Sequence, residues 1–277
     1  MIYLCAVATK SDLFEVQIFK TIAEKLGYNV RIFGENKDWK GFISKIEYFC
    51  EGLEGINDDD LVVCSDCYDV IPLRKADEFE VESLKYLERD VKIIASAEMY
   101  CLFNCRQMKV WHEKSSLKIN EGLKYVNAGL IFGKAKDLRK MWETFLQRRV
   151  EDDQIALSQY FDENYDSCFL DSFSDFFQTS ASNKYVPRIS SNLLSEESKN
   201  GEGTFFVHIP SLSNHLCQRE YYRDVLAHVA KRLKLEHLVG PQVKTSISSI
   251  VEKYLFPFVL FALIFMVFLY YLKNKNV

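Results

Sequence analysis

Residues 2–33 alternate between two short apolar runs and one helical pattern. Ile2–Ala8 is continuously apolar, as a strand buried on both faces would be, and Asn29–Phe33 is a second strand-like run. Between them, Leu13–Leu26 repeats apolar residues at the spacing of one helix face, and Gly27 ends the pattern. This order predicts a right-handed βαβ unit, and therefore a parallel sheet in an α/β fold.

A third apolar run ends in two carboxylates. Leu61–Cys64 suits a buried strand and leads into Asp66 and Asp69, before Val70–Pro72 carries the chain away. Ligands bind at the carboxyl ends of strands in open α/β sheets, so these oxygens are placed to hold a divalent cation against a phosphate-bearing substrate. A turn in which the aspartates only cap a loop explains the same residues without a metal.

The remaining patterns extend the same α/β alternation. Met99–Leu123 fits neither a strand nor a helix pattern. We predict further strands at Val91–Ala97, Lys124–Gly133, Cys168–Leu170, Phe173–Phe177 and Thr204–His208, and helices at Phe42–Leu53, Ala76–Glu88, Ala135–Val150 and Asn214–Leu235, with one more opening at Asp152. These elements form a single domain over residues 1–238.

The C-terminal residues have the composition of a membrane span. Tyr254–Leu272 is 19 residues without a charge, enough to cross about 30 Å of hydrocarbon as a helix. A buried core helix of this length should instead show a polar face. We therefore predict a linker (239–253), a transmembrane anchor (254–272) and a short tail (273–277). Because the N-terminal apolar run reads as a strand and not as a secretion signal, the domain is expected on the cytosolic side.

Charge and cysteine content narrow the function classes. A net charge of −4 with scattered Lys and Arg argues against a nucleic-acid partner. Among the eight cysteines, the close pairs Cys64 with Cys67 and Cys101 with Cys105 have spacings seen in structural zinc sites. Cys64 lies in an apolar strand, however, which favours reduced, buried thiols.

Seven short motifs in a fixed order carry a family resemblance. The chain resembles the glycosyltransferase domain of the procollagen lysyl hydroxylases and is similar to the collagen glucosyl- and galactosyltransferases. The motifs are Val7–Lys10, Asn29–Gly34 with Asp38–Gly41, Ser65–Ile71, Ser96–Cys101, Tyr125–Ala135, Asp152–Gln154, and the pair Val207 and His208.

This resemblance implies a GT-A fold, which is a Rossmann-like mixed sheet flanked by helices. It also implies that the domain binds a UDP-sugar, UDP-glucose or UDP-galactose, through Mn²⁺. On the matching positions, Asp66, Asp69 and His208 would hold the metal. The expected activity is transfer of a hexose to a hydroxyl of a protein or glycan acceptor.

The resemblance also implies roles for eight further residues. Six would contact the donor and two would lie on the acceptor side. Surface packing is the alternative for the donor contacts, and a helix N-terminus that favours carboxylates is the alternative for the acceptor pair. The donor contacts are Thr9, Lys10, Trp39, Tyr68, Glu98 and Asn127, and the acceptor pair is Asp152 and Asp153.

The chain departs from the family pattern after His208. The family continues there with a glycine-containing loop that approaches the diphosphate, whereas this chain has Ile209, Pro210 and Ser211. The alternative function is therefore a tail-anchored protein with a degenerate fold that binds nucleotide sugars, or acts as a scaffold, without transfer. The chain also shows no iron-binding constellation, so hydroxylation is not expected.

Overall fold

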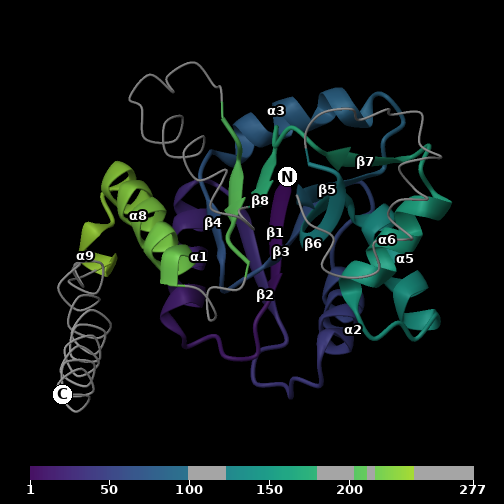
Figure 1. Ribbon diagram of the computed structural model, residues 1–277, viewed down its shortest axis with the longest axis horizontal. Coiled ribbons are helices and arrows are strands. Elements are labelled where there is room, and N and C mark those ends of the chain that lie inside the picture. The colour runs from purple at the N-terminus through teal and green to yellow at the C-terminus, as the bar shows by residue number, and fades with distance from the viewer. Residues whose placement is uncertain (99–122, 180–202, 211–215, 240–277) are drawn as a thin grey trace, which may run out of the picture.

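The computed structural model describes residues 1–98, 123–179, 203–210 and 216–239. These residues form one mixed sheet with helices on both of its faces (Figure 1). Within these ranges, none of the helices has the length and apolar character needed to cross a membrane. The predicted anchor, Tyr254–Leu272, lies outside the described residues, as do Cys101 and Cys105.

The strands follow the order β2-β1-β3-β6-β5-β8-β9-β4, and β7 also pairs with β5. β1 is parallel to β2 and β3, which confirms the predicted βαβ opening, while β6 is antiparallel to both of its neighbours. The strands are β1 (Ile2–Val7), β2 (Asn29–Phe33), β3 (Leu61–Asp66), β4 (Val70–Pro72), β5 (Ile93–Glu98), β6 (Tyr125–Lys134), β7 (Cys168–Asp171), β8 (Phe177–Thr179) and β9 (Phe206–His208).

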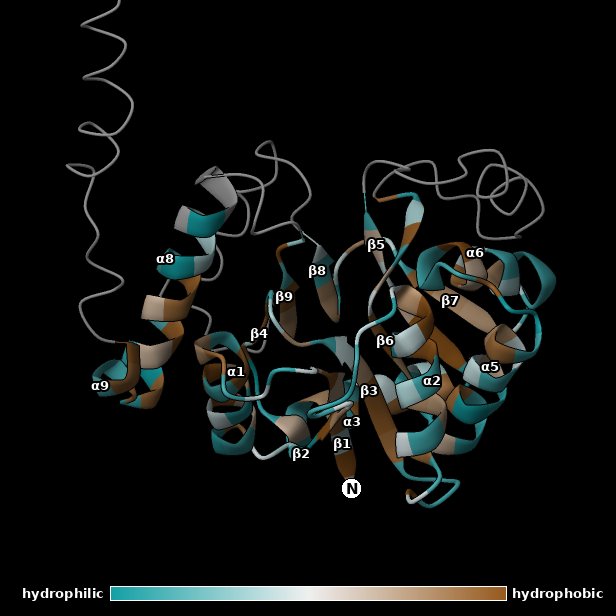
Figure 2. Cartoon of the chain, turned by 90° about the horizontal axis from the view of Figure 1, so that it is seen from below, coloured by the Kyte–Doolittle hydropathy of each residue, from teal (hydrophilic) through white to brown (hydrophobic). Residues whose placement is uncertain are grey.

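The helices divide between the two faces of the sheet. Three of them, α1, α3 and α8, cover one apolar cluster, and α2, α5 and α6 cover the other. Hydrophobic colours dominate the strands between these layers in Figure 2. The helices are α1 (Phe14–Lys25), α2 (Phe42–Leu53), α3 (Ala76–Leu87), α5 (Ala135–Gln147), α6 (Asp153–Glu163), α8 (Leu216–Leu233) and α9 (Glu236–Val239).

Aromatic packing fixes α5 and α2 beside the sheet. Leu138, Trp142 and Phe145 of α5 recur at helical spacing and are fully or almost fully buried. Trp142 stacks on Phe49 of α2 with ring centroids 4.7 Å apart. This contact matters for function because α2 also carries a buried lysine to the end of the sheet.

One predicted strand is wrong. The pattern placed it at Phe173–Phe177, but Phe173 is 67% exposed and the strand is β8, which only begins at Phe177. The preceding residues form a turn around the buried Asp171, whose carboxylate accepts backbone N–H bonds from Asp175, Phe176 and Phe177 at 2.7–2.9 Å. The hydrogen bonds of one carboxylate thus override an apolar pattern.

The cysteines whose side chains the structure describes are free thiols, and all but Cys50 are buried. They are Cys5, Cys50, Cys64, Cys67 and Cys168. Burial raises the pKa of the Cys64 thiol to about 12, so this side chain stays protonated at neutral pH. Cys64 is 2% exposed and belongs to no group of three or more metal-ligating side chains among the described residues, so the structure favours a packing role for it.

Candidate active site

The strand ends gather the predicted site residues along one edge of the sheet. Val7 of β1 pairs with Phe33 of β2 and with Asp66 of β3, so the loops that follow these three strands lie side by side. β5, β8 and β9 run in the same direction, and their last residues, Glu98, Thr179 and His208, reach the same end. We call this end the carboxyl edge.

Asp66, Asp69 and His208 meet at the carboxyl edge. Their potential ligand atoms lie within 4.8 Å of one another. Nε2 of His208 is 3.5 Å from Oδ2 of Asp66 and 3.4 Å from Oδ1 of Asp69. Neighbouring ligands of a cation bound at about 2.2 Å lie about 3 Å apart, so the three side chains are close to the spacing of a shared metal ion.

The histidine ring is held with one nitrogen towards the carboxylates. Its Nδ1 lies 3.0 Å from Oδ1 of Asn127, while the buried Nε2 has no hydrogen-bond partner among the described residues. Gly129 makes room for the ring, because a Cβ atom there would lie 2.2 Å from Cε1 of His208. Burial lowers the pKa of His208, but the carboxylates of Asp69 and Asp66 outweigh it and the net shift is upward.

Two carboxylates and one imidazole suit a divalent cation such as Mn²⁺. The buried Nε2 atom supports this fit, because a buried polar atom without a partner is costly unless a ligand satisfies it. The contact between Nδ1 and Asn127 is the kind of outer interaction that orients a metal-binding histidine. The structure therefore brings together all three residues of the predicted metal site.

A buried lysine, for which the sequence pattern predicts no site role, links the predicted metal site to α6. Nζ of Lys45 lies 2.6 Å from both Asp66 and Asp153, and it donates a 3.0 Å hydrogen bond to the carbonyl of Ala128. Burial lowers the pKa of Lys45, but its two carboxylate partners outweigh it and raise the pKa overall. In the sequence, Lys45 lies among the apolar residues of one face of Phe42–Leu53. A charged residue in that position is seldom buried unless it is paired, and this pattern could have indicated a site role.

Glu98 and Asn127, both predicted at the donor, belong to one hydrogen-bonded group. Asn127 donates to Oε2 of Glu98 at 3.2 Å, and Gln154 of α6 donates to Oε1 at 2.7 Å. Ser96 donates to the backbone carbonyl of Asn127 at 2.9 Å. Burial raises the pKa of Glu98, against the opposing effect of these two amide donors. Ser96 and Gln154 lie in two of the family motifs, but no site role was predicted for either residue.

Asp152 and Asp153 have different structural tasks at the start of α6. Asp152 is the N-cap residue, and its Oδ1 accepts the backbone N–H groups of Gln154 and Ile155 at 3.0 and 2.9 Å. Asp153 is 4% exposed and pairs with Lys45. Burial raises the pKa of Asp153 and Asp66 adds to the rise, while Lys45 opposes both.

The other predicted donor residues line the loops of the carboxyl edge. Trp39 is 49% exposed and packs edge-to-face on Phe42 with centroids 6.2 Å apart. Tyr68 lies between the two aspartates and packs partly against the core. The carbonyl of Thr9 accepts the backbone N–H of Asn36 at 3.1 Å, and Lys10 is exposed.

The departure after His208 has a structural counterpart. Ile209 is fully buried, and its backbone N–H donates a 2.9 Å hydrogen bond to the carbonyl of Asp69. This N–H group is thus committed to the protein and not to a diphosphate. The same bond ties the end of β9 to the turn that carries Asp69.

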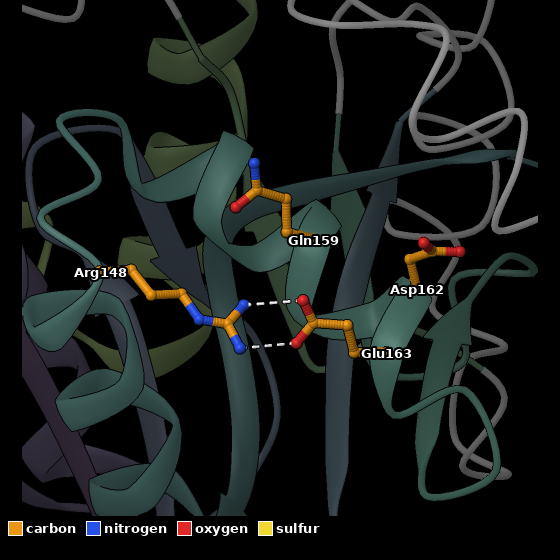
Figure 3. Close-up of a pocket in the computed structure, with 4 residues that line it drawn as sticks. All are labelled: Arg148, Gln159, Asp162 and Glu163. Atoms are coloured by element: carbon orange, nitrogen blue, oxygen red, sulfur yellow. Dashed lines mark hydrogen bonds and ion pairs between the residues drawn. The ribbon is translucent and has the colours of Figure 1, made fainter.

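A separate pocket of about 450 Å³ lies at the other end of α6 and is lined by Arg148, Gln159, Asp162 and Glu163 (Figure 3). Arg148 and Glu163 form a two-pronged ion pair with N–O distances of 2.9 and 2.7 Å. The guanidinium is therefore already neutralised by a carboxylate. Asp153, at the first residue of α6, lies at the opposite end of the helix from this pocket.

Two solved structures were compared with the fold of this chain. A solved glycosyltransferase involved in glycosylation of the major capsid of PBCV-1 shares the fold, with a TM-score of 0.51 and 12% identity over 81% of this chain and 98% of the other. Apo mouse xyloside xylosyltransferase 1 has a TM-score of 0.48 and 11% identity over 78% of this chain and all of the other.

Sequence comparison gives the family. The uncharacterized protein R699 of Acanthamoeba polyphaga mimivirus is 31% identical over 159 residues, which are 53% of this chain and 32% of R699. This chain thus aligns with about a third of that relative. The family model described as the PLOD GT domain matches residues 1–192. The chain belongs to the PLOD GT domain family and carries a glycosyltransferase domain of that family.

Proposed function

We propose that this chain transfers a hexose from UDP-glucose or UDP-galactose to a hydroxyl of a protein or glycan, and that it depends on Mn²⁺. The observation that carries the proposal is the convergence of Asp66, Asp69 and His208, with the buried Nε2 atom directed at the two carboxylates. A bound divalent cation would offset the charge of the diphosphate and assist the departure of UDP.

The residues around the metal site divide the remaining tasks. Lys45 holds Asp66 in place and keeps its pKa low against the effect of burial. The group of Glu98, Asn127 and Gln154 offers oxygen acceptors and amide donors of the kind that sugar hydroxyls bind. These groups are already oriented by their mutual hydrogen bonds, which reduces the cost of ordering them around a donor.

We place the acceptor beside the N-terminus of α6. Oδ1 of Asp152 makes both cap hydrogen bonds, and Oδ2 takes no part in the cap. Oδ2 of Asp152 is therefore assigned to an acceptor hydroxyl, as an orienting group or as a base. Asp153 is assigned a positioning role, because its carboxylate is buried against Lys45.

The test is release of UDP from a panel of UDP-sugars by the detergent-solubilised full chain, with Mn²⁺ and with a chelator. We expect metal-dependent release from UDP-glucose or UDP-galactose, because the leaving diphosphate needs charge compensation. Release that persists unchanged in the chelator would contradict the metal assignment. Equal rates across the panel would contradict hexose selectivity.

A nucleotide-sugar-binding protein without transfer is the second candidate. It is favoured by the buried Ile209, whose N–H bonds to Asp69 where the family has a glycine-containing loop. Such a protein would melt at a higher temperature with Mn²⁺ and UDP, because a ligand that binds only the folded state stabilises it. A clear shift without UDP release from any donor and acceptor would select this candidate.

We further propose that residues 254–272 anchor the protein in a membrane, with the domain on the cytosolic side. The support is the uncharged apolar sequence of this segment, flanked by Lys253 and Lys273. The expected result is retention of the full chain in the membrane pellet after alkaline carbonate extraction, with the domain digested by protease added outside sealed vesicles. Full extraction, or protection of the domain, would contradict the proposal.

A further inference from the structure

One face of the sheet changes from apolar to polar at the carboxyl edge. Along each strand, residues two apart point to the same face of the sheet. The residues of one face can therefore be traced along each strand to the carboxyl edge. The apolar residues on this face belong to a single core cluster. In this way Ile94 gives way to Ser96 and Glu98 on β5, Phe177 to Thr179 on β8, and Phe206 to His208 on β9.

Thr179 occupies the middle of this polar row. It pairs with His208 across β8 and β9, and the neighbouring Gln178 pairs with Ala97, which places Thr179 level with Glu98. Adjacent strands lie about 4.8 Å apart. The backbone of Thr179 therefore lies between the strand that carries His208 and the strand that carries Glu98, and the functions described above give this residue no task.

The hydroxyl of Thr179 is buried without a partner. The residue is 5% exposed, and its Oγ1 makes no hydrogen bond in the part of the chain that the structure describes. A buried hydroxyl without a hydrogen bond is destabilising, so a partner beyond the described residues is expected. Nε2 of His208, on the neighbouring strand, also makes no hydrogen bond, although carboxylate oxygens of Asp66 and Asp69 lie 3.5 and 3.4 Å from it.

The position of Thr179 is fixed by the protein. Asp171 binds the three backbone N–H groups that lead into β8, including that of Phe177. Phe177 packs against Phe206 of β9 with ring centroids 5.9 Å apart. The strand thus presents its last hydroxyl at the carboxyl edge from a packed support, as a preorganised binding group requires.

We propose that the Thr179 hydroxyl binds a hydroxyl group of the sugar carried by the nucleotide donor. The assignment rests on the proposed function and adds a residue to its donor site. A threonine hydroxyl both donates and accepts, as a sugar hydroxyl does. Thr179 pairs with His208 and lies level with Glu98, so a sugar attached to a diphosphate at the proposed metal site would lie close to the end of β8.

The test compares Thr179→Val, which keeps the shape and removes the hydroxyl, with Thr179→Ser, which keeps the hydroxyl. Dissociation constants of UDP and of UDP-glucose and UDP-galactose are measured by calorimetry on the full chain with Mn²⁺. We expect Thr179→Val to weaken the UDP-sugar bound by the unmodified chain about tenfold. UDP should bind unchanged, and Thr179→Ser should restore most of the loss.

Thr144→Val is the matched control, because the hydroxyl of Thr144 on α5 bonds only within its own helix, to the carbonyl of Lys140. It should leave both dissociation constants unchanged. Equal affinities of Thr179→Val and the unmodified chain for the UDP-sugar would overturn the assignment alone. A parallel loss of UDP affinity would also overturn it, since the contact would then be to the nucleotide. If the unmodified chain binds no UDP-sugar, the proposed function fails and this assignment with it.

Discussion

Asp69→Ala is expected to lower the rate of UDP release by at least about a thousandfold, the largest effect of any single substitution proposed for this chain. The carboxylate of Asp69 lies 3.4 Å from Nε2 of His208 in the metal site. Its backbone carbonyl, which alanine retains, keeps the hydrogen bond from Ile209. The variant should therefore fold while losing the side-chain oxygen that we assign to the cation. The measurement is UDP release with saturating Mn²⁺.

Asp59→Ala is the matched control for this loss. Asp59 is an exposed aspartate whose partners are Lys134 and Lys136, on the surface. We expect it to retain full activity. A ligand-free melting temperature close to that of the unmodified chain would show that Asp69→Ala is folded, and the stabilisation by Mn²⁺ and UDP together should disappear. Activity within tenfold of the unmodified chain would refute the metal assignment.

Lys45→Met is expected to produce the largest loss of stability. It keeps an unbranched side chain and removes the ammonium that is buried between Asp66 and Asp153. Removing one partner of a buried ion pair costs about 3–5 kcal/mol, because the remaining charge stays buried without compensation. For a domain of this size the thermal midpoint should fall by about 10 °C. Thermal unfolding followed by circular dichroism measures this shift.

The loss of stability caused by Lys45→Met should be smaller at acidic pH than at neutral pH. Burial already raises the pKa of Asp153, and Lys45 is the main group that opposes the rise. Without the lysine, the folded protein binds a proton at Asp153 that the unfolded chain releases at the same pH. Stability then falls as the pH rises, so the deficit of Lys45→Met should shrink on acidification towards the unperturbed carboxyl pKa.

Two variants separate this explanation from a general packing defect. In Lys45→Met/Asp153→Asn the uncompensated carboxylate is gone, and part of the lost stability should return. Lys37→Met removes an exposed ammonium that pairs with Glu51, and it should leave the midpoint unchanged. A double variant no more stable than Lys45→Met at any pH would point to packing as the cause.

The fold followed from the sequence wherever burial alone determined the structure. Ile2–Val7 and Asn29–Phe33 are strands as predicted. A short apolar run between loop residues in an α/β chain usually forms a buried strand. The gathering of Asp66 and Asp69 at the carboxyl edge followed from the same logic. His208 was added by family resemblance, since no local pattern connects it to residues of β3.

The remaining features depend on contacts that no local pattern contains. Lys45 appears in the sequence as one charged residue in a helix, and only the tertiary contacts of α2 with Asp66 of β3 and Asp153 of α6 reveal its two carboxylate partners. The turn before β8 depends on one side chain, Asp171, that satisfies three backbone groups. Thr179 was overlooked because a single polar residue at a strand end has no distinctive spacing.

The distribution of the metal-site residues along the chain affects the order of folding. Asp66 ends β3 and Asp69 immediately precedes β4, whereas His208 ends β9, and β6 must insert between β3 and β5 in the interval. Contacts between segments so distant in sequence require closure of long loops, which slows folding. During synthesis, a ligand that depends on all three residues of the proposed metal site can therefore stabilise the domain only after β9 has emerged from the ribosome. The first two hundred residues must persist until then without help from the ligand.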